Sequence, residues 1–125
     1  MKNIKKILVG GCFNIIHPGH IYFLQTAKCF GNYLIVVLTN DKNNLKEYKT
    51  GTLDRIKMLK ELKIIDKIVV GDENNFYKAI DNEKPDMVVL GHDQTLPDKK
   101  NNKKYFFETY SLKKYKKYET KKYRE

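Results

Sequence analysis

Short apolar runs and helix-like stripes alternate along residues 4–90. Residues 4–10 and 33–39 are rich in Ile, Leu and Val, which is typical of strands buried on both faces. Residues 18–30 between them carry apolar side chains at helical spacing, and Gly31 follows as a stop signal. Pro18 suits the first turn of a helix, because its missing N–H would have no partner there. The pattern predicts a strand, a helix and a second strand.

The same alternation continues, with helices predicted over residues 52–62 and 74–82 and strands over 67–70 and 86–90. Apolar strands joined by helical crossovers predict a parallel sheet covered on both sides. The fold class is therefore α/β, with a Rossmann-like, doubly wound parallel sheet in a single domain. Ligands of such sheets bind beyond the carboxyl ends of the strands, so a site should draw on residues 10–20, 40–51, 71–75 and 91–95.

The C-terminal part differs from the rest in composition. Residues 98–125 contain eleven basic and four acidic residues, a surplus of seven within a total net charge of +10. We expect residues 1–97 to form the Rossmann-like core, and residues 98–125 to form a basic Lys/Tyr-rich segment that is either part of the same domain or a tail. Residues 105–112 fit an edge strand and a helix equally well. The uneven charge makes binding to nucleic acid a secondary hypothesis.

Length and cysteine content narrow the class of protein. A chain of 125 residues is the size of one domain, and its longest apolar run is too short for a membrane span, which needs about 20 residues. No secretory signal follows the basic start. Its 2 cysteines, Cys12 and Cys29, form no CxxC pair and no disulfide framework. These features favour a protein of the reducing cytoplasm without a membrane partner.

The side chains best suited to act on a ligand lie in the first connection between strand and helix, residues 10–20, which we call the histidine turn. There, His17 and His20 flank Pro18-Gly19. A helix N-terminus offers unpaired N–H donors and a partial positive charge, and two imidazoles add directed donors. These groups suit a phosphate. Two alternatives are ordinary surface histidines and a zinc site in which Cys12 or His92 joins the pair, although no ligand spacing of a closed zinc site is present.

The run GCFNIIHPGH resembles the GxFDxxHxGH signature of the HxGH nucleotidyltransferases, also called the cytidylyltransferase-like superfamily, whose members have a Rossmann-like fold. The similarity extends over about residues 5–96, through an Asp after the second strand, an Arg in the next helix and the LGHDQ end of the fourth strand. The short chain resembles both archaeal FAD synthase and glycerol-3-phosphate cytidylyltransferase, and its segment PDMVVLGHDQ is closer to the first.

The resemblance implies a nucleotidyltransferase. A phosphate oxygen of an acceptor attacks the α-phosphorus of a nucleoside triphosphate, Mg²⁺ accompanies the triphosphate, and pyrophosphate leaves. Such chemistry asks the protein for positioning and charge stabilisation. The favoured substrates are ATP and FMN. The alternative enzyme uses CTP with glycerol 3-phosphate or another sugar or alcohol phosphate, and a second alternative is a non-catalytic protein that binds nucleotide or nucleic acid. Small members of the superfamily are often homodimers.

The resemblance also assigns roles to residues. His17, His20, Lys46 and Arg55 are the expected catalytic residues, and no metal ligand of the chain is expected. The nucleotide is expected to contact the histidine turn and the end of the fourth strand, and the acceptor to contact the loop after the second strand. The nucleotide-binding set is Gly11, Cys12, Phe13, Asn14, His17, Gly19, His20 and Asp93, and the acceptor-binding set is Lys46 and Lys49.

Three features depart from the signature. Cys12 stands where members usually have Thr, and Asn14 stands where they have Asp. Asn retains the turn-forming ability of Asp but loses its charge, which weakens any role in binding Mg²⁺ or the acceptor. Cytidylyltransferases also carry an RTxGISTS-like segment near the C-terminus, and this sequence has none. The missing segment weakens a cytidylyltransferase assignment, which favours an adenylyltransferase, and it also supports the non-catalytic alternative.

Overall fold

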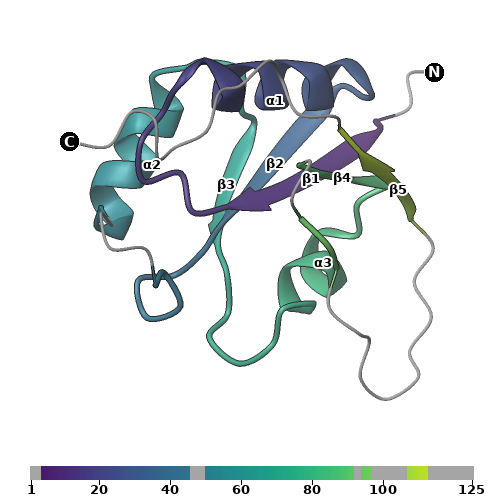
Figure 1. Ribbon diagram of the computed structural model, residues 1–125. Coiled ribbons are helices and arrows are strands. Elements are labelled where there is room, and N and C mark those ends of the chain that lie inside the picture. Colours follow the sequence, from purple (N-terminus) through teal and green to yellow (C-terminus); the bar gives the residue numbers. More distant parts are fainter. Residues whose placement is uncertain (1–3, 46–49, 92–93, 97–106, 113–125) are drawn as a thin grey trace.

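The computed structural model describes residues 4–45, 50–91, 94–96 and 107–112. Within them, helices and strands alternate (Figure 1) in the order that the apolar pattern predicts. The elements are β1 (Lys6–Gly11), α1 (Pro18–Cys29), β2 (Tyr33–Leu38), α2 (Thr52–Lys60), β3 (Lys67–Val70), α3 (Lys78–Glu83), β4 (Met87–Leu90) and β5 (Glu108–Ser111).

The sheet has five strands in the order β3-β2-β1-β4-β5, and all neighbours are parallel. After β1 the chain moves outward through β2 and β3, then crosses back to place β4 on the other side of β1. The strand order therefore reverses between β1 and β4, and such a reversal opens a ligand crevice at the carboxyl ends of an α/β sheet. This arrangement confirms the predicted Rossmann-like α/β class.

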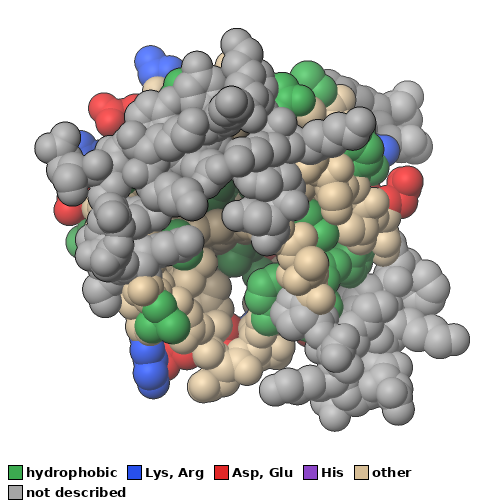
Figure 2. All heavy atoms as spheres, in the orientation of Figure 1, with side chains coloured by type: hydrophobic (Ala, Val, Ile, Leu, Met, Phe, Trp, Pro, Cys, Tyr) green, Lys and Arg blue, Asp and Glu red, His purple; other side chains and the backbone are tan. Residues whose placement is uncertain are grey.

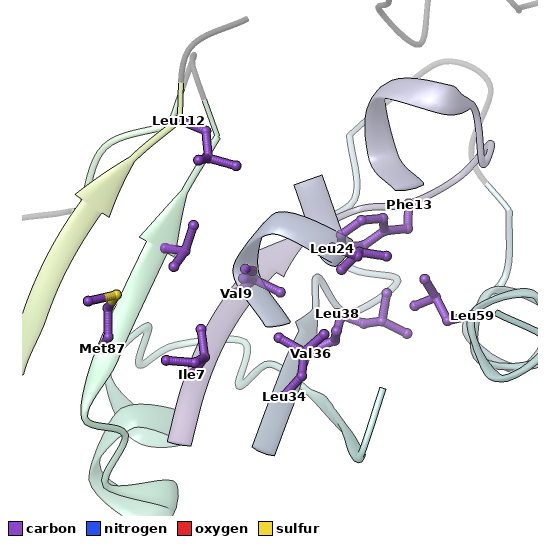
Figure 3. Packing of buried hydrophobic residues seen from close by; sticks show 12 residues of the cluster. Ile7, Val9, Phe13, Leu24, Leu34, Val36, Leu38, Leu59, Met87 and Leu112 are labelled. Carbon is purple, nitrogen blue, oxygen red and sulfur yellow. The ribbon is translucent and has the colours of Figure 1, made fainter. Parts of the chain in front are cut away.

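The core lies on both faces of the sheet. On one face, Leu24 of α1 and Leu59 of α2 pack with Ile7, Val9 and side chains of β2, as Figure 3 shows. On the other face, Tyr77 and Ile80 around α3 pack against inward side chains of β1, β2 and β4. A strand that is apolar on both faces is stable only when both are covered, which explains the continuous apolar runs in the sequence.

Two helices are shorter than the apolar pattern predicts. Instead of spanning residues 74–82, α3 begins at Lys78, because the Asp72 carboxylate accepts hydrogen bonds from the backbone N–H groups of Asn74 and Asn75. Such local side-chain bonds hold the backbone in turns and compete with a helix. The helix expected over residues 52–62 ends at Lys60, shortly before Lys63 adopts a left-handed φ of 58°. The strand predicted over residues 67–70 is confirmed as β3, and the boundaries of β1, β2 and β4 lie within two residues of those predicted.

Part of the C-terminal segment belongs to the sheet. Residues 108–111 form β5, which pairs with β4 in register from Met87 with Glu108 to Leu90 with Ser111. The choice that the sequence left open over residues 105–112 is therefore an edge strand in the described part. The Tyr110 ring packs on Phe30 at the end of α1, with 4.7 Å between ring centroids. The proposed boundary at residue 97 stays a prediction.

Two further observations concern the surface and the helices. On the face in Figure 2, the described Lys and Arg side chains lie around the periphery and form no single basic patch. Among the helices of the described part of the chain, none is long and apolar enough to cross a membrane.

Candidate active site

Four loops meet at the carboxyl edge of the sheet, as the strand pattern predicts. The loop after β2 is tied to the β1–α1 turn by the backbone N–H of Thr39, which donates to the Gly11 carbonyl at 3.0 Å. Asn40 Nδ2 donates to the Gly71 carbonyl after β3 at 3.0 Å. After β4, Gln94 Nε2 donates to the Gly10 carbonyl at 2.9 Å. Side chains from separate loops can therefore act on one ligand here.

Buried polarity gathers at the same edge. The described residues contain five buried polar or charged side chains, and all of them lie in the β1–α1 turn, in the loop after β2 or in α2. Burying polar groups costs free energy unless they are hydrogen-bonded, so such a concentration marks a site with a function beyond packing. These side chains are Asn14, His17, Asn40, Asn44 and Arg55.

The two histidines form a stacked pair. Their ring centroids are 4.0 Å apart and their planes differ by 21°. His17 is the N-cap of α1, and its Nδ1 accepts a hydrogen bond from the Gly19 N–H at 3.1 Å. An accepting Nδ1 carries no proton, so neutral His17 is protonated at Nε2 and can donate there. Burial lowers the pKa of His17, which keeps the ring neutral near pH 7.

The N-terminus of α1 supplies positive potential beside the pair. Pro18 occupies the first turn, as predicted, and no acidic residue lies in that turn. The partial positive charge of the helix end is therefore not neutralised from within the helix. Stacked imidazoles and an uncompensated helix N-terminus make this turn suitable for a phosphate group.

Phe13 shapes the turn through an unusual backbone. Its φ is 51°, a left-handed value that costs a bulky residue about 1–3 kcal/mol. The ring is buried and lies 5.1 Å from the His20 ring, centroid to centroid. A Cβ on Gly11 would lie 2.8 Å from this ring, so the position beneath it requires glycine. Phe13 thus supports His20 from the core side of the turn.

Asn14 joins the turn to the loop after β2. Its Nδ2 donates to Asn44 Oδ1 at 3.1 Å, and Asn44 Nδ2 donates back to Asn14 Oδ1 at 2.8 Å. Thr50 adds two hydrogen bonds, from its N–H to Asn14 Oδ1 and from its hydroxyl to the Asn14 carbonyl. Asn14 therefore lies within the site, where its own amide is engaged by protein groups.

Arg55 lies beneath the turn and is fully buried. Its Nη1 donates to the Cys12 carbonyl at 2.9 Å, and its Nη2 forms an ion pair with Asp41 at 3.0 Å. A hydrogen bond from the Thr52 hydroxyl, and then the guanidinium, holds the pKa of Asp41 below its ordinary value. Among the described residues, Arg55 Nε has no hydrogen-bond partner. The structure therefore places Arg55 at the site, in contact with the backbone of the histidine turn.

The remaining predicted positions are unevenly placed. Gly11, Cys12 and Gly19 lie in the histidine turn, where Cys12 is half-buried and both described cysteines are free thiols. Lys46, Lys49 and Asp93 lie outside the described residues, as does His92 of the alternative zinc site. The roles assigned to these residues stay predictions.

Asn44 and Gln94 are site residues that the sequence analysis did not single out. Gln94 Oε1 accepts from the Gly91 N–H at 2.7 Å while its Nε2 reaches Gly10, so one amide bridges the ends of β1 and β4. Both residues lie in loops after strands, within the segments predicted to form the site. A search for amide side chains in those segments would have flagged them, although asparagine is common in this chain.

The described residues contain no group of three His, Cys, Asp or Glu side chains that could hold a metal ion. The carboxylate of Asp41, in the loop after β2, forms an ion pair with Arg55.

The chain is similar to a known protein family and to curated relatives. The cytidylyltransferase-like family matches residues 8–123. An FAD synthase of Ferroglobus placidus is 40% identical over 93 residues, which cover 73% of this chain and 61% of that protein. An FAD synthase of Methanohalophilus mahii is 37% identical over 98 residues, which cover 75% of this chain and 68% of that protein.

A solved structure is also similar. The lipopolysaccharide core biosynthesis protein of Thermoplasma volcanium superposes with a TM-score of 0.82 at 29% identity, covering 90% of this chain and 99% of that one. The chain spans about three fifths of the length of the first curated relatives it matches, at 61% and 63%. Motif, fold and matches together place this chain in the cytidylyltransferase-like family.

Proposed function

We propose that this chain is a nucleotidyltransferase that transfers AMP from ATP to FMN and releases pyrophosphate. The observation that carries the proposal is the stacked His17–His20 pair at the uncompensated N-terminus of α1. It lies beside the point of the sheet where the strand order reverses, which is the expected ligand crevice. Relatives named FAD synthase support the choice of ATP and FMN.

In the proposed reaction, a phosphate oxygen of FMN attacks the α-phosphorus of ATP. The new P–O bond forms as the bond from the α-phosphorus to the bridging oxygen breaks, and that oxygen leaves with pyrophosphate. This reaction needs no covalent nucleophile from the chain. Neutral His17 donates from Nε2 to a phosphate oxygen, His20 acts beside it, and the N-terminus of α1 stabilises the charge that develops.

Other parts of the site hold the substrates. Lys46 and Lys49 are proposed to bind the phosphate of the acceptor, and Lys46 also to stabilise the transition state, since both belong to the loop after β2. Asp93 is proposed to contact the nucleotide, since it follows β4. Arg55, which the resemblance assigns to the nucleotide, instead supports the turn through the Cys12 carbonyl in the described structure. A direct role for its guanidinium in catalysis stays a prediction.

Magnesium is proposed to arrive with the triphosphate. Because the described residues hold no cluster of metal-ligating side chains, the phosphate oxygens themselves would carry the ion there. A bound divalent ion would neutralise phosphate charge during transfer. A reducing compartment such as the cytoplasm is the proposed location, and a homodimer is the proposed assembly.

The proposal is tested by product formation with defined substrate pairs. ATP with FMN should yield FAD, identified by mass spectrometry, together with one pyrophosphate per FAD. CTP with glycerol 3-phosphate is the matched alternative pair, and faster turnover with it would replace the proposal. Nucleotide-dependent thermal stabilisation without turnover on either pair would instead support the non-catalytic binding protein.

A further inference from the structure

Asn14 and Asn44 form a reciprocal amide pair in the protein interior. Each side chain donates to the oxygen of the other, over 3.1 Å and 2.8 Å. Asn14 is 4% exposed and Asn44 is fully buried. Two asparagines so placed satisfy one donor and one acceptor each without any water, so the pair depends on both residues being amides.

The orientation of the pair is fixed by Thr50. Its backbone N–H can only donate, and it lies 2.8 Å from Asn14 Oδ1. Asn14 Nδ2 must therefore face Asn44, and Asn44 must present its oxygen in return. The Thr50 hydroxyl adds a second tie, to the Asn14 carbonyl at 2.9 Å. The assignment of nitrogen and oxygen is set by the network as a whole.

An acid at either position breaks this match. A carboxylate has no N–H, so aspartate at position 14 would face the Asn44 oxygen with one of its own oxygens. Rotating the Asn44 amide only moves the repulsive contact to the other half of the pair. Asn14 stands where the signature has aspartate, and buried Asn44 is the partner that makes an amide fit there.

We propose that Asn14 and Asn44 are matched positioning residues that fasten the connection between β2 and α2 to the histidine turn, and thereby set the affinity for the phosphorylated acceptor. This rests on the proposed function, because the acceptor is assigned to that connection. Asn44 precedes and Thr50 follows the middle of the connection, and both are bonded to Asn14. Asn14 is therefore bonded to both described ends of the connection.

Of the residues expected to bind the nucleotide, only Asn14 belongs to the amide pair, and the two histidines are held by other contacts. His17 is fixed by the Gly19 N–H, and the His20 ring is supported by Phe13 and His17. None of these contacts involves Asn44. Loosening the amide pair should therefore weaken binding of the acceptor more than binding of ATP, which distinguishes positioning from a general loss of folding.

The test compares Asn44→Asp with Asn43→Asp. Both variants make the same charge change on the same connection, but the Asn43 side chain is exposed and donates only to the Glu73 carbonyl among the described residues. With Asn44→Asp we expect KM for FMN to rise at least about tenfold, as befits a buried polar group left unmatched. The thermal shift given by ATP alone should be retained. Asn43→Asp should leave both quantities within about twofold.

Thr50→Val provides a milder variant in case Asn44→Asp does not fold. It removes the hydroxyl bond to Asn14 and retains the N–H bond, so KM for FMN should rise by a smaller factor. Equal losses of ATP and FMN affinity in these variants would overturn the proposal, as would an unchanged KM for FMN in both.

Failure of the proposed function would appear separately, as an absence of product from the unaltered chain with either substrate pair. The amide pair is then judged by hydrogen exchange at the Thr50 N–H, which is bonded to Asn14. Faster exchange in Asn44→Asp than in Asn43→Asp would support the fastening role. Equal exchange in the two variants would refute it.

Discussion

Phe13 in the histidine turn has a backbone conformation that bulky residues rarely adopt. Its φ is left-handed, and this conformation places its ring between His20 and Gly11. Strain of this kind persists where the surrounding packing fixes it, and it is common at functional sites. We therefore expect the turn to be rigid, so that adding even one methyl group inside it lowers the free energy of unfolding.

Gly11→Ala tests that stiffness. The new methyl group would lie 2.8 Å from Phe13 Cε2, so the ring or the backbone must move. We expect the free energy of unfolding to fall by about 1–3 kcal/mol in urea titrations. Gly51→Ala is the control, because a Cβ there meets nothing within 4 Å. Equal stability of the two variants would show that the ring is not tightly held.

His17 predicts a pH dependence of stability. Burial lowers its pKa in the folded protein below the ordinary 6.5, so the unfolded chain binds the proton more tightly. Stability should therefore rise with pH between the lowered pKa and 6.5 and then level off. His17→Asn retains a side chain able to cap α1 but does not titrate. Unfolding free energies between about pH 5.5 and 7.5 should rise less in this variant, and identical slopes would contradict the assignment.

At the scale of elements, one side chain of α2 contacts and supports the histidine turn. Arg55 reaches from α2 to the Cys12 carbonyl and to Asp41 after β2. The ridge of Ile56 and Leu59 packs the same helix on the core. The element therefore joins the apolar interior to the polar site.

Arg55→Leu should destabilise the protein by removing the contact between α2 and the histidine turn. The Cys12 carbonyl would lose its charged donor inside the protein, which costs about 2–3 kcal/mol. The midpoint of thermal unfolding should fall by several degrees. Lys57→Leu removes the same charge from an exposed position of the same helix and should leave the midpoint nearly unchanged. Equal midpoints of thermal unfolding in the two variants would show that the Arg55 contacts do not stabilise the protein.

The elements also show what the sequence could and could not predict. Strands β1 and β2 and helix α1 were predictable because short continuous apolar runs, helical spacing and Pro18 are local signals. The late start of α3 was not, since Asp72 competes for the backbone only when its side chain folds over Asn74 and Asn75. The Asn14–Asn44 pair joins residues thirty positions apart, and no periodicity records such a contact.

At the scale of the whole molecule, the sheet order brings these parts to one edge. Because β4 crosses back beside β1, the histidine turn, the loop after β2 and Gln94 all meet where the strand order reverses. The excess of basic residues lies mostly in residues 98–125, of which only residues 107–112 are described. The chemistry proposed for this chain is argued from the described residues at the carboxyl edge of the sheet.

The most direct test follows AMP transfer from ATP labelled at the α-phosphorus to FMN. His17→Ala and His20→Ala are compared with Gln25→Ala, an exposed position on the same helix. Loss of one donor to a phosphoryl transition state should lower kcat by about 10²–10³-fold in each histidine variant. Gln25→Ala should transfer AMP at the rate of the unaltered chain. Full transfer by either histidine variant would contradict the central claim that this pair acts on the triphosphate.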